Sequence, residues 1–425
     1  MNWRDYPRPR PFARAPSLRG CVAVIALMIA ALAVPGSAAA QIEILDGDRP
    51  GIELGGYVRS LTGLRDAGHD TPGEARRTGF HGQVVRLRWR LTWGDDVVLS
   101  VHNRLQTTVA SSAGAFGGAA GLGVSVIPGR PVDLSTRIVS EDRIAIWHDV
   151  DRLALTVYTG AADITIGRQA ITWGLAQLFP VADVWALFSP FELDTEEKPG
   201  VDAVRVLSYP ADRLELDAVV AARGRAEDWS AGVRATHNFA SADVYLAAGK
   251  LWNQLMVLGG VAYLLDRITL RGEAAVPWVL GEDSPDRPRI TIGFDRPGMR
   301  LSFSGEYHYG GAGAESSASY MGHLSDPRLR RGEVYLLGRH YLGAAVSFIP
   351  TRDERLSLAL SALLNAGDGS ASLTPLLNYD VGQSASVSLG AIHSFGERPS
   401  LDPPSLPSEF GAYGHLWFAR VSVFF

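Results

Sequence analysis

The sequence predicts an all-β chain whose antiparallel strands close into a barrel that spans a membrane. Three observations carry this prediction. Short segments alternate apolar and polar residues, which is the pattern of a strand with one apolar face. The joins between these segments alternate between short and long. The chain begins with an export leader, and no later stretch approaches the roughly 18 consecutive apolar residues of a transmembrane helix.

The N-terminus has the three regions of a secretory signal peptide. Residues 1–20 hold five arginines against one acid, Asp5; an apolar run from Cys21 to Pro35 and the small residues 37–40 follow. We expect cleavage before Gln41, which leaves 41–425 as one barrel domain. That mature chain has 35 basic and 44 acidic residues, a net charge of −9, and no cysteine. Nucleic acid is therefore disfavoured as a partner, disulfides and thiolate metal sites are excluded, and no cofactor or metal is expected.

The clearest strand is the segment 83–93. One face is apolar and carries Val85, Leu87, Trp89, Leu91 and Trp93. The other face is polar and carries Arg86, Arg88, Arg90 and Thr92. A soluble β-sandwich could produce this alternation, but tryptophans on the apolar face and three stacked arginines on the other suit a lipid-facing wall and a wet lumen.

About eighteen strands are expected along the chain, with sixteen as the nearest alternative. They lie near 52–60, 83–93, 97–109, 143–159, 163–172, 200–209, 212–222, 229–239, 242–252, 255–265, 267–277, 288–295, 298–309, 333–349, 354–365, 371–380, 384–395 and 411–425. An even number brings both termini to the periplasm. The short joins, such as 209–212 and 265–267, are expected on the periplasmic side, and the long ones, 278–287, 310–332 and 396–410, outside. Tryptophans near the strand ends are expected to form girdles: Trp93, Trp173, Trp229, Trp252 and Trp278.

The last strand runs to the terminal phenylalanine. Alternate residues from Phe425 back to Trp417 are apolar. This ending resembles the closing strand of Gram-negative outer-membrane β-barrels, where the insertion machinery reads it. The resemblance implies an integral outer-membrane protein in contact with membrane lipid and lipopolysaccharide. An edge strand of a soluble sandwich is the alternative interpretation.

The segment 166–200 is the least barrel-like part of the mature chain. Gly174 interrupts the strand, 181–188 could form a turn or two of helix, and the apolar residues between them are too many for a loop in bulk water. We therefore expect this loop to fold inward against the barrel wall. Its pattern Gly167-Arg-Gln169, Trp173-Gly174, Pro180, Asp183, Pro190-Phe191, Asp194 and Lys198–Asp202 resembles a motif of porin-like outer-membrane barrels, many of unknown function.

The resemblance implies which residues anchor the loop and which line the pore. Arg168, Gln169, Trp173 and Gly174 are expected to anchor the loop, although the strand parity of Arg168 also suits a structural strut. In general porins an inward loop faces a basic ladder. Here the ladder would be Arg86, Arg88, Arg90 and Arg104, and the acids Asp183, Asp194, Glu196 and Glu197. Opposed charges of this kind select polar or charged solutes; the alternative is that they only solvate the lumen and pair with one another.

The sequence-based hypothesis is a channel for the passive diffusion of small polar or charged solutes. The runner-up is a barrel of an export or envelope-assembly system that moves a hydrophobic or polymeric substrate. An enzyme is not expected, because the sequence has no hydrolase, metalloprotease or nucleotide-binding motif, although His102, His308 and His340 leave a barrel enzyme open. Porins often trimerise, so a homo-oligomer also stays open.

Overall fold

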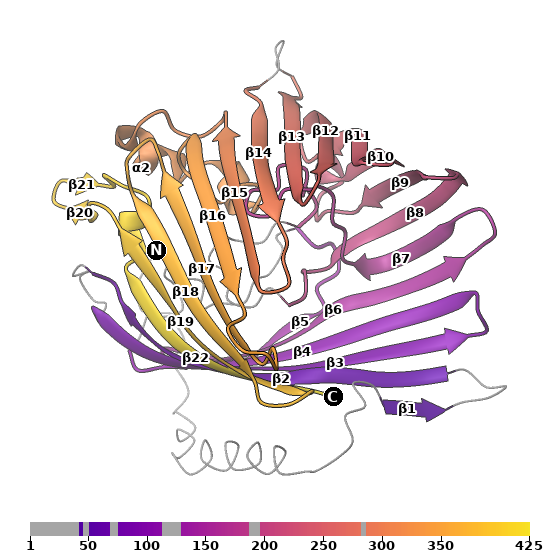
Figure 1. Ribbon diagram of the computed structural model, residues 1–425, viewed down its shortest axis with the longest axis horizontal. Coiled ribbons are helices and arrows are strands. Elements are labelled where there is room, and N and C mark those ends of the chain that lie inside the picture. The colour runs from indigo at the N-terminus through magenta and orange to yellow at the C-terminus, as the bar shows by residue number, and fades with distance from the viewer. Residues whose placement is uncertain (1–41, 46–50, 69–74, 113–128, 187–195, 282–285) are drawn as a thin grey trace, which may run out of the picture. The chain divides into compact units, whose positions relative to one another are not determined.

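The computed structural model describes residues 42–45, 51–68, 75–112, 129–186, 196–281 and 286–425. All of them belong to one compact unit, Ala40–Phe425. Within these residues, eighteen antiparallel strands form a closed ring, because the last strand pairs with both its predecessor and the first strand of the ring. Figure 1 shows the strands following one another in chain order from β2 to β22.

The ring strands match the predicted segments closely. They are β2 (Gly51–Asp66), β3 (Arg77–Trp93), β4 (Val97–Ala110), β6 (Ile144–Tyr158), β7 (Asp163–Gln169), β8 (Val201–Ala211), β9 (Leu214–Ala221), β10 (Ser230–Asn238), β11 (Ala242–Leu251), β12 (Gln254–Leu265), β13 (Ile268–Val279), β14 (Arg289–Arg296), β15 (Leu301–Gly310), β16 (His340–Phe348), β17 (Leu356–Asn365), β18 (Ala371–Asp380), β19 (Ala385–Phe395) and β22 (His415–Phe424). The prediction of eighteen strands is confirmed.

Several short elements lie outside the ring. Strand β1 (Ile42–Leu45) pairs with β2, β5 (Ser135–Glu141) pairs with β6, and β20 (Ser400–Leu401) pairs with β21 (Pro404–Ser405). The helices are short: α2 (Tyr320–His323), α3 (Pro327–Arg330), η1 (Ala226–Asp228), η2 (Ser317–Ser319) and η3 (Phe410–Ala412). None of the helices in the described ranges is long and apolar enough to cross a membrane.

The two faces of β3 show how the alternation produces the wall. Arg86 is buried on the lumen side, whereas Trp93 is 41% exposed on the outer side. The outward apolar run Val85–Trp93, at about 3.3 Å per residue and a tilt of about 40°, covers about 23 Å of height. This height matches the apolar band of about 25 Å on membrane barrels. The first part of β3, before Val85, therefore extends beyond the band. Both β2 and β3 are longer than predicted.

Strand β22 closes the ring. Its outward residues Trp417 and Val421 are exposed, as their parity predicts. Leu416 and Phe418, of the other parity, point inward and belong to a small apolar cluster inside the barrel. The amide of Phe425 donates to the Gly56 carbonyl over 3.1 Å, and the Gly56 amide donates to the Phe425 carbonyl over 2.8 Å. The terminal residue thus extends the pairing with β2.

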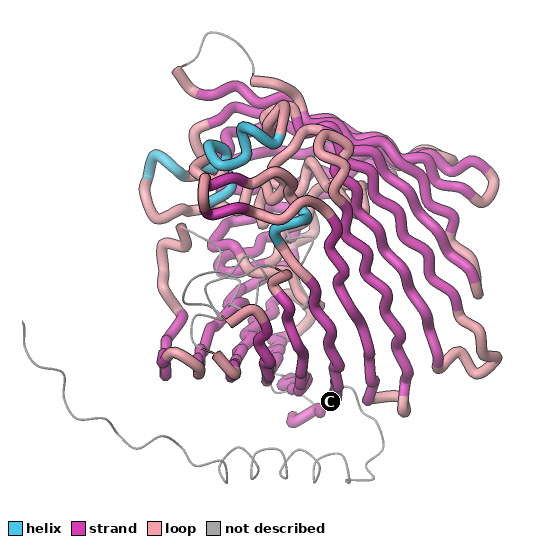
Figure 2. The backbone as a smooth tube through the Cα atoms, turned by 90° about the vertical axis from the view of Figure 1, so that its left-hand side faces the viewer, coloured by secondary structure: helices cyan, strands magenta, loops and turns pink. Residues whose placement is uncertain are grey.

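Short turns gather at one end of the ring and long segments at the other. Figure 2 shows the helices and larger loops at the end opposite the C-terminus. Another predicted boundary is wrong: β16 begins at His340 and not near 333, because residues 333–339 form bends and irregular backbone instead of strand.

The expected tryptophan girdle is wrong at two positions. Trp229 is 49% exposed, as a girdle position requires, but Trp173 and Trp252 are buried. Trp252 lies under the guanidinium groups of Arg223 and Arg331, at 4.6 and 5.0 Å from the ring centre. A tryptophan at a strand end can therefore serve the interior as well as the membrane interface.

The distribution of turns predicts the orientation of the barrel. A cysteine that replaces Ala318, an exposed residue of the long segment after β15, should react with an impermeant maleimide on intact cells. A cysteine that replaces Ala211, at the β8–β9 turn, should react only after the outer membrane is permeabilised. The reverse pattern of labelling would show that the barrel is inserted the other way.

Candidate functional site

The described parts of the connection between β7 and β8, residues 170–186 and 196–200, lie inside the ring. Its backbone binds side chains of β13 and β15, strands on the far side of the ring from β7. Figure 1 shows this chain running within the circle of strands. The expected inward loop is therefore present in the residues that the structure describes.

Two buried glutamates of the wall hold the backbone of this loop. Glu306 accepts hydrogen bonds from three consecutive amides, those of Gln177 at 2.6 Å and of Leu178 and Phe179 at 2.9 Å each. Glu273 accepts from the Leu175 amide. Irregular backbone has no ladder in which to pair, and buried amides left without acceptors would be costly. The two carboxylates supply those acceptors, with the added strength of charged hydrogen bonds.

Neighbouring wall residues bind the carbonyl groups of the same stretch. Nη1 of Arg271 on β13 donates to the Leu175 carbonyl over 2.7 Å, and Oγ1 of Thr291 on β14 donates to the Phe179 carbonyl over 2.8 Å. Amides and carbonyls of residues 175–179 are thus bound by three adjacent strands. These hydrogen bonds take the place of the strand pairing that this irregular stretch lacks.

Apolar side chains pack the rest of the loop against the wall. Trp173 and Trp185 meet edge to face, with ring centres 5.0 Å apart. The indole nitrogen of Trp173 donates to Asp217 on β9 over 2.9 Å. The loop residues share one cluster with the wall residues Val201, Val219, Tyr245, Met256 and Leu258. This packing fills the side of the lumen formed by β8 to β13.

The helix considered for 181–188 is not present in its described part. Residues 181–186 form a turn and a bend. The Val184 amide donates to the Ala182 carbonyl over 3.0 Å, which is a three-residue turn. Val181, Ala182 and Trp185 are all buried, so contacts with the wall decide the path of this segment. Leu187 and Phe188 lie outside the described residues.

The four residues of the predicted anchoring motif have different surroundings. Gly174 has a φ of +104°, and a Cβ there would lie 3.1 Å from Oε1 of Glu273. The side chain of Gln169 binds the carbonyls of Thr165 and Ala203 over 3.1 and 3.2 Å. Trp173 and Gly174 are thus loop residues that lie against the wall residues Asp217 and Glu273, whereas Gln169 links β7 to β8.

Arg168 is buried and binds the wall rather than the loop. Its guanidinium donates to Asp202 on β8 over 2.7 and 3.0 Å and to the Val150 carbonyl on β6 over 2.9 Å. It also donates to the carbonyl of Val132, before β5. These contacts join β6, β8 and the segment that precedes β5, as a structural strut would.

A buried ion pair closes the base of the loop. Nζ of Lys198 binds Oδ1 of Asp183, and both side chains are less than one tenth exposed. Lys198 also donates to Oγ1 of Thr172 over 3.2 Å. Burial raises the pKa of Asp183 to about 6, against the effect of the Lys198 ammonium. Because Asp183 lies in the first part of the loop and Lys198 near its end, the ion pair holds these two parts together.

The returning part of the loop places acids directly on the predicted basic ladder. Glu197 binds Nη1 of the buried Arg86, and Nη2 of Arg86 binds Asp151 on β6. Glu197 also lies 3.5 Å from Nη1 of Arg88 and 3.1 Å from Nδ1 of His102. Burial opposes the charge of Glu197, but His102 and Arg86 lower its pKa to about 2.

The other predicted charges divide into paired and open groups. Glu196 binds Arg59 on β2 over 3.0 Å. Arg104 donates to Gln106 over 2.7 Å and has no carboxylate partner among the described residues. Arg88 is 37% exposed in its side chain and Arg90 is exposed. Asp194 lies outside the described residues. Glu196 and Glu197 thus touch arginines rather than facing them across an open gap.

A second buried network ties the loops at the same end of the ring together. Glu409, after β21, accepts from the Leu337 amide over 3.0 Å and from Asn365 over 2.8 Å, and it binds the Tyr341 hydroxyl. Phe410 and Tyr341 share an apolar cluster with Phe179 of the inward loop. Burial raises the pKa of Glu409 to about 7. The segments 311–339 and 396–414 are thus packed with the inward loop.

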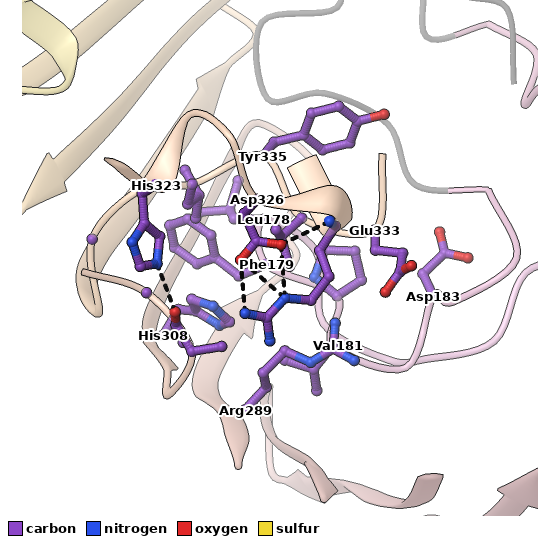
Figure 3. A pocket seen from close by; sticks show the side chains of 18 residues that line it. Leu178, Phe179, Val181, Asp183, Arg289, His308, His323, Asp326, Glu333 and Tyr335 are labelled. Atoms are coloured by element: carbon purple, nitrogen blue, oxygen red, sulfur yellow. Dashed lines mark hydrogen bonds and ion pairs between the residues drawn. The ribbon is translucent and has the colours of Figure 1, made fainter. Parts of the chain in front are cut away.

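A cavity of about 90 Å³ lies between the inward loop and the segment 311–339. Figure 3 shows Phe179 beside His308 at this cavity, with Arg289, Asp326 and Glu333 around it. The rings of Phe179 and His308 stack, with centres 5.3 Å apart. A cavity of this volume has room for only a few water molecules.

Sequence reasoning did not identify Glu273, Glu306, Asp151 or Arg59. A signal existed for the first two, since each is an acid on the inward parity of a strand whose other face is apolar. Their partners could not be found in this way, because they lie 98 and 129 residues away in the chain.

Comparison with known proteins identifies the fold. Neither a scan against protein-family models nor a search of curated proteins finds a match. Among solved structures, OccAB1 of Acinetobacter baumannii is similar, with a TM-score of 0.55 and 11% identity over 92% of this chain and 99% of that chain. OpdK of Pseudomonas aeruginosa gives 0.53 and 12% over 88% and 98%. A BenF-like porin of Pseudomonas fluorescens Pf-5 gives 0.52 and 10% over 88% and 98%.

These similarities define the class of fold. The chain has the closed 18-strand antiparallel barrel of outer-membrane porins. The predicted porin-like architecture is thereby confirmed.

Replacement of Glu306 tests the attachment of the loop. In Glu306→Gln the charge is lost and one oxygen must serve three amides, so the attachment should weaken by about 3 kcal/mol. Hydrogen exchange at Leu178 and Phe179 should then become roughly a hundredfold faster. Glu215→Gln is the control, because Glu215 binds Arg234 on the wall. Unchanged exchange at both amides in Glu306→Gln would contradict this role.

The network around Glu409 should be sensitive to pH. The pKa of Glu409 is raised from 4.5 to about 7, so folding favours its protonated form. Stability should fall as the pH rises from 4.5 through about 7, by about 3 kcal/mol in all. Protection of the Leu337 amide, corrected for intrinsic exchange, should therefore be greater at pH 5.5 than at pH 8.5 by at least roughly tenfold. Glu409→Gln should remove this difference; an equal dependence in the variant would refute the role of Glu409.

Proposed function

We propose that this protein is an outer-membrane channel for the passive diffusion of small polar solutes, with a preference for anions. One observation carries the proposal: the described part of the loop is bound to one side of the barrel interior, whereas arginines of the β3 wall keep accessible side chains. The loop packs on β8 to β13, while Arg88 and Arg90 stay accessible on β3. The solved structures of similar fold, which include porins, support a channel.

The charge arrangement supports an anion preference. Glu197 offsets Arg86, and Glu196 offsets Arg59. Arg88 has only a long contact with the same Glu197, and Arg90 has no ion pair among the described residues. In a confined lumen, walls of low dielectric constant focus the field of such groups and raise the local concentration of anions. The remaining charged residues then have a supporting role and set the position of the ladder and the loop. They are Arg86, Arg104, Asp183, Glu196 and Glu197.

The cellular setting completes the proposal. We infer that residues 1–40 are cleaved on export and that the barrel is integral to the outer membrane. Its outer face would contact membrane lipid and lipopolysaccharide, and the insertion machinery would read the strand that ends at Phe425. An export barrel for a polymeric substrate would need a lumen cleared of the bound loop, so the channel function is favoured. No catalytic chemistry is proposed.

The preference for anions can be measured directly. In Arg88→Gln/Arg90→Gln, the reversal potential in a tenfold KCl gradient should shift toward the equilibrium potential of K⁺. The expected shift is on the order of 10 mV, compared with the roughly 59 mV of an ideally selective channel. Arg300→Gln, in the exposed β14–β15 turn, is a control of equal chemistry outside the lumen. An unchanged reversal potential in the double variant would refute the assigned role, and absence of conductance in the wild-type protein would refute the channel.

A further inference from the structure

Glu197 occupies a position built for an anion. Arg86 and Arg88 on β3 and His102 on β4 direct three nitrogen atoms toward its carboxylate. The side chain of Arg86 is 3% exposed and that of Glu197 is 13% exposed, so the contact is largely removed from water. Guanidinium and imidazole groups converging in this way form a site for a carboxylate.

We propose that Glu197 is a tethered counter-ion: it fills an anion site made by Arg86, Arg88 and His102 that otherwise binds a small carboxylate from the lumen. The proposal rests on the proposed channel function and adds to it a binding site with an internal occupant. The consequence is kinetic. Anions attracted by the ladder pass the site without being retained, because the strongest position on the ladder is already taken.

The structure explains why the tether is effective. Lys198, the next residue, is fixed through its side chain by Asp183 and through its carbonyl by Nη2 of Arg152. Glu197 therefore loses little conformational entropy when it binds Arg86. A group tethered in this way acts at an effective concentration of millimolar or above, so free carboxylates at lower concentrations compete poorly.

The site can lose Glu197 without losing its framework. Asp151 binds Nη2 of Arg86, whereas Glu197 binds Nη1, so Arg86 keeps an acidic partner when Glu197 is removed. Glu196 provides a matched comparison: it is the neighbouring residue and binds Arg59, but its side chain is 44% exposed. A general loss of negative charge from the loop would occur in both variants, whereas an opened anion site would occur in one.

Chemical replacement of the carboxylate tests the proposal. Single-channel chloride currents are recorded in planar bilayers while sodium formate is added, with ionic strength held constant. In Glu197→Ala, formate should reduce the current saturably, with a half-blocking concentration at least about tenfold below that of the wild-type protein. Glu196→Ala should keep the half-blocking formate concentration of the wild-type protein, because Glu196 binds Arg59 and is not part of the site of Arg86, Arg88 and His102. Glu197→Gln, which keeps the size of the side chain, should also be blocked at lower formate concentrations and should prefer anions more strongly.

The outcomes separate this inference from the channel function. If Glu197→Ala and Glu197→Gln conduct but their half-blocking concentrations lie within twofold of the wild-type value, the anion site is refuted while the channel stands. Equal sensitivity of Glu196→Ala and Glu197→Ala would refute it as well, because loss of loop charge alone would then explain the effect. A wild-type protein without conductance would refute the proposed function itself. Heat-modifiability on gels confirms that each variant is folded.

Discussion

Two carboxylates of the wall, Glu306 and Glu273, determine where the inward loop can lie. Backbone without regular structure is tolerated at membrane depth only when its polar groups are satisfied within the protein or by water. Four amides of residues 175–179 meet this requirement through these two side chains. A buried carboxylate is itself costly unless it is hydrogen-bonded. Loop and wall therefore depend on each other: the amides stabilise the charges, and the charges fix the path of the loop.

This attachment gives the two sides of the interior different chemistry. The side from β8 to β13 receives the tryptophans and aliphatic residues of the loop and becomes an ordinary packed core. The side from β2 to β6 receives the returning acids, and its arginines range from buried to exposed. A passage beside the loop would thus have a charged wall on one side and the loop backbone on the other. The preference for anions that we propose follows from this asymmetry.

The architecture could be predicted because strand pattern is local. The alternation and the short turns place most strands of the ring within a few residues, since each depends only on neighbouring positions; the end of β2 and the starts of β3 and β16 differ from the prediction by more. The site could be predicted only in part. Trp173 and Gly174 stand out as breaks in a strand, but the acceptor for Gln177 lies 129 residues away. Direct contact of Glu197 with Arg86 depends on how far the loop reaches, and no local pattern encodes that reach.

The cluster of Phe179, Tyr341 and Phe410 joins parts of the chain that are far apart in the sequence. It packs the inward loop against the segments 311–339 and 396–414. Packed interiors transmit strain rather than absorb it. In the orientation that we propose, an antibody or a bacteriophage that binds either segment would therefore apply force to the inward loop as well. Recognition from outside and permeability would then be mechanically coupled in the proposed channel, and a binder selected against these segments would act on the pore.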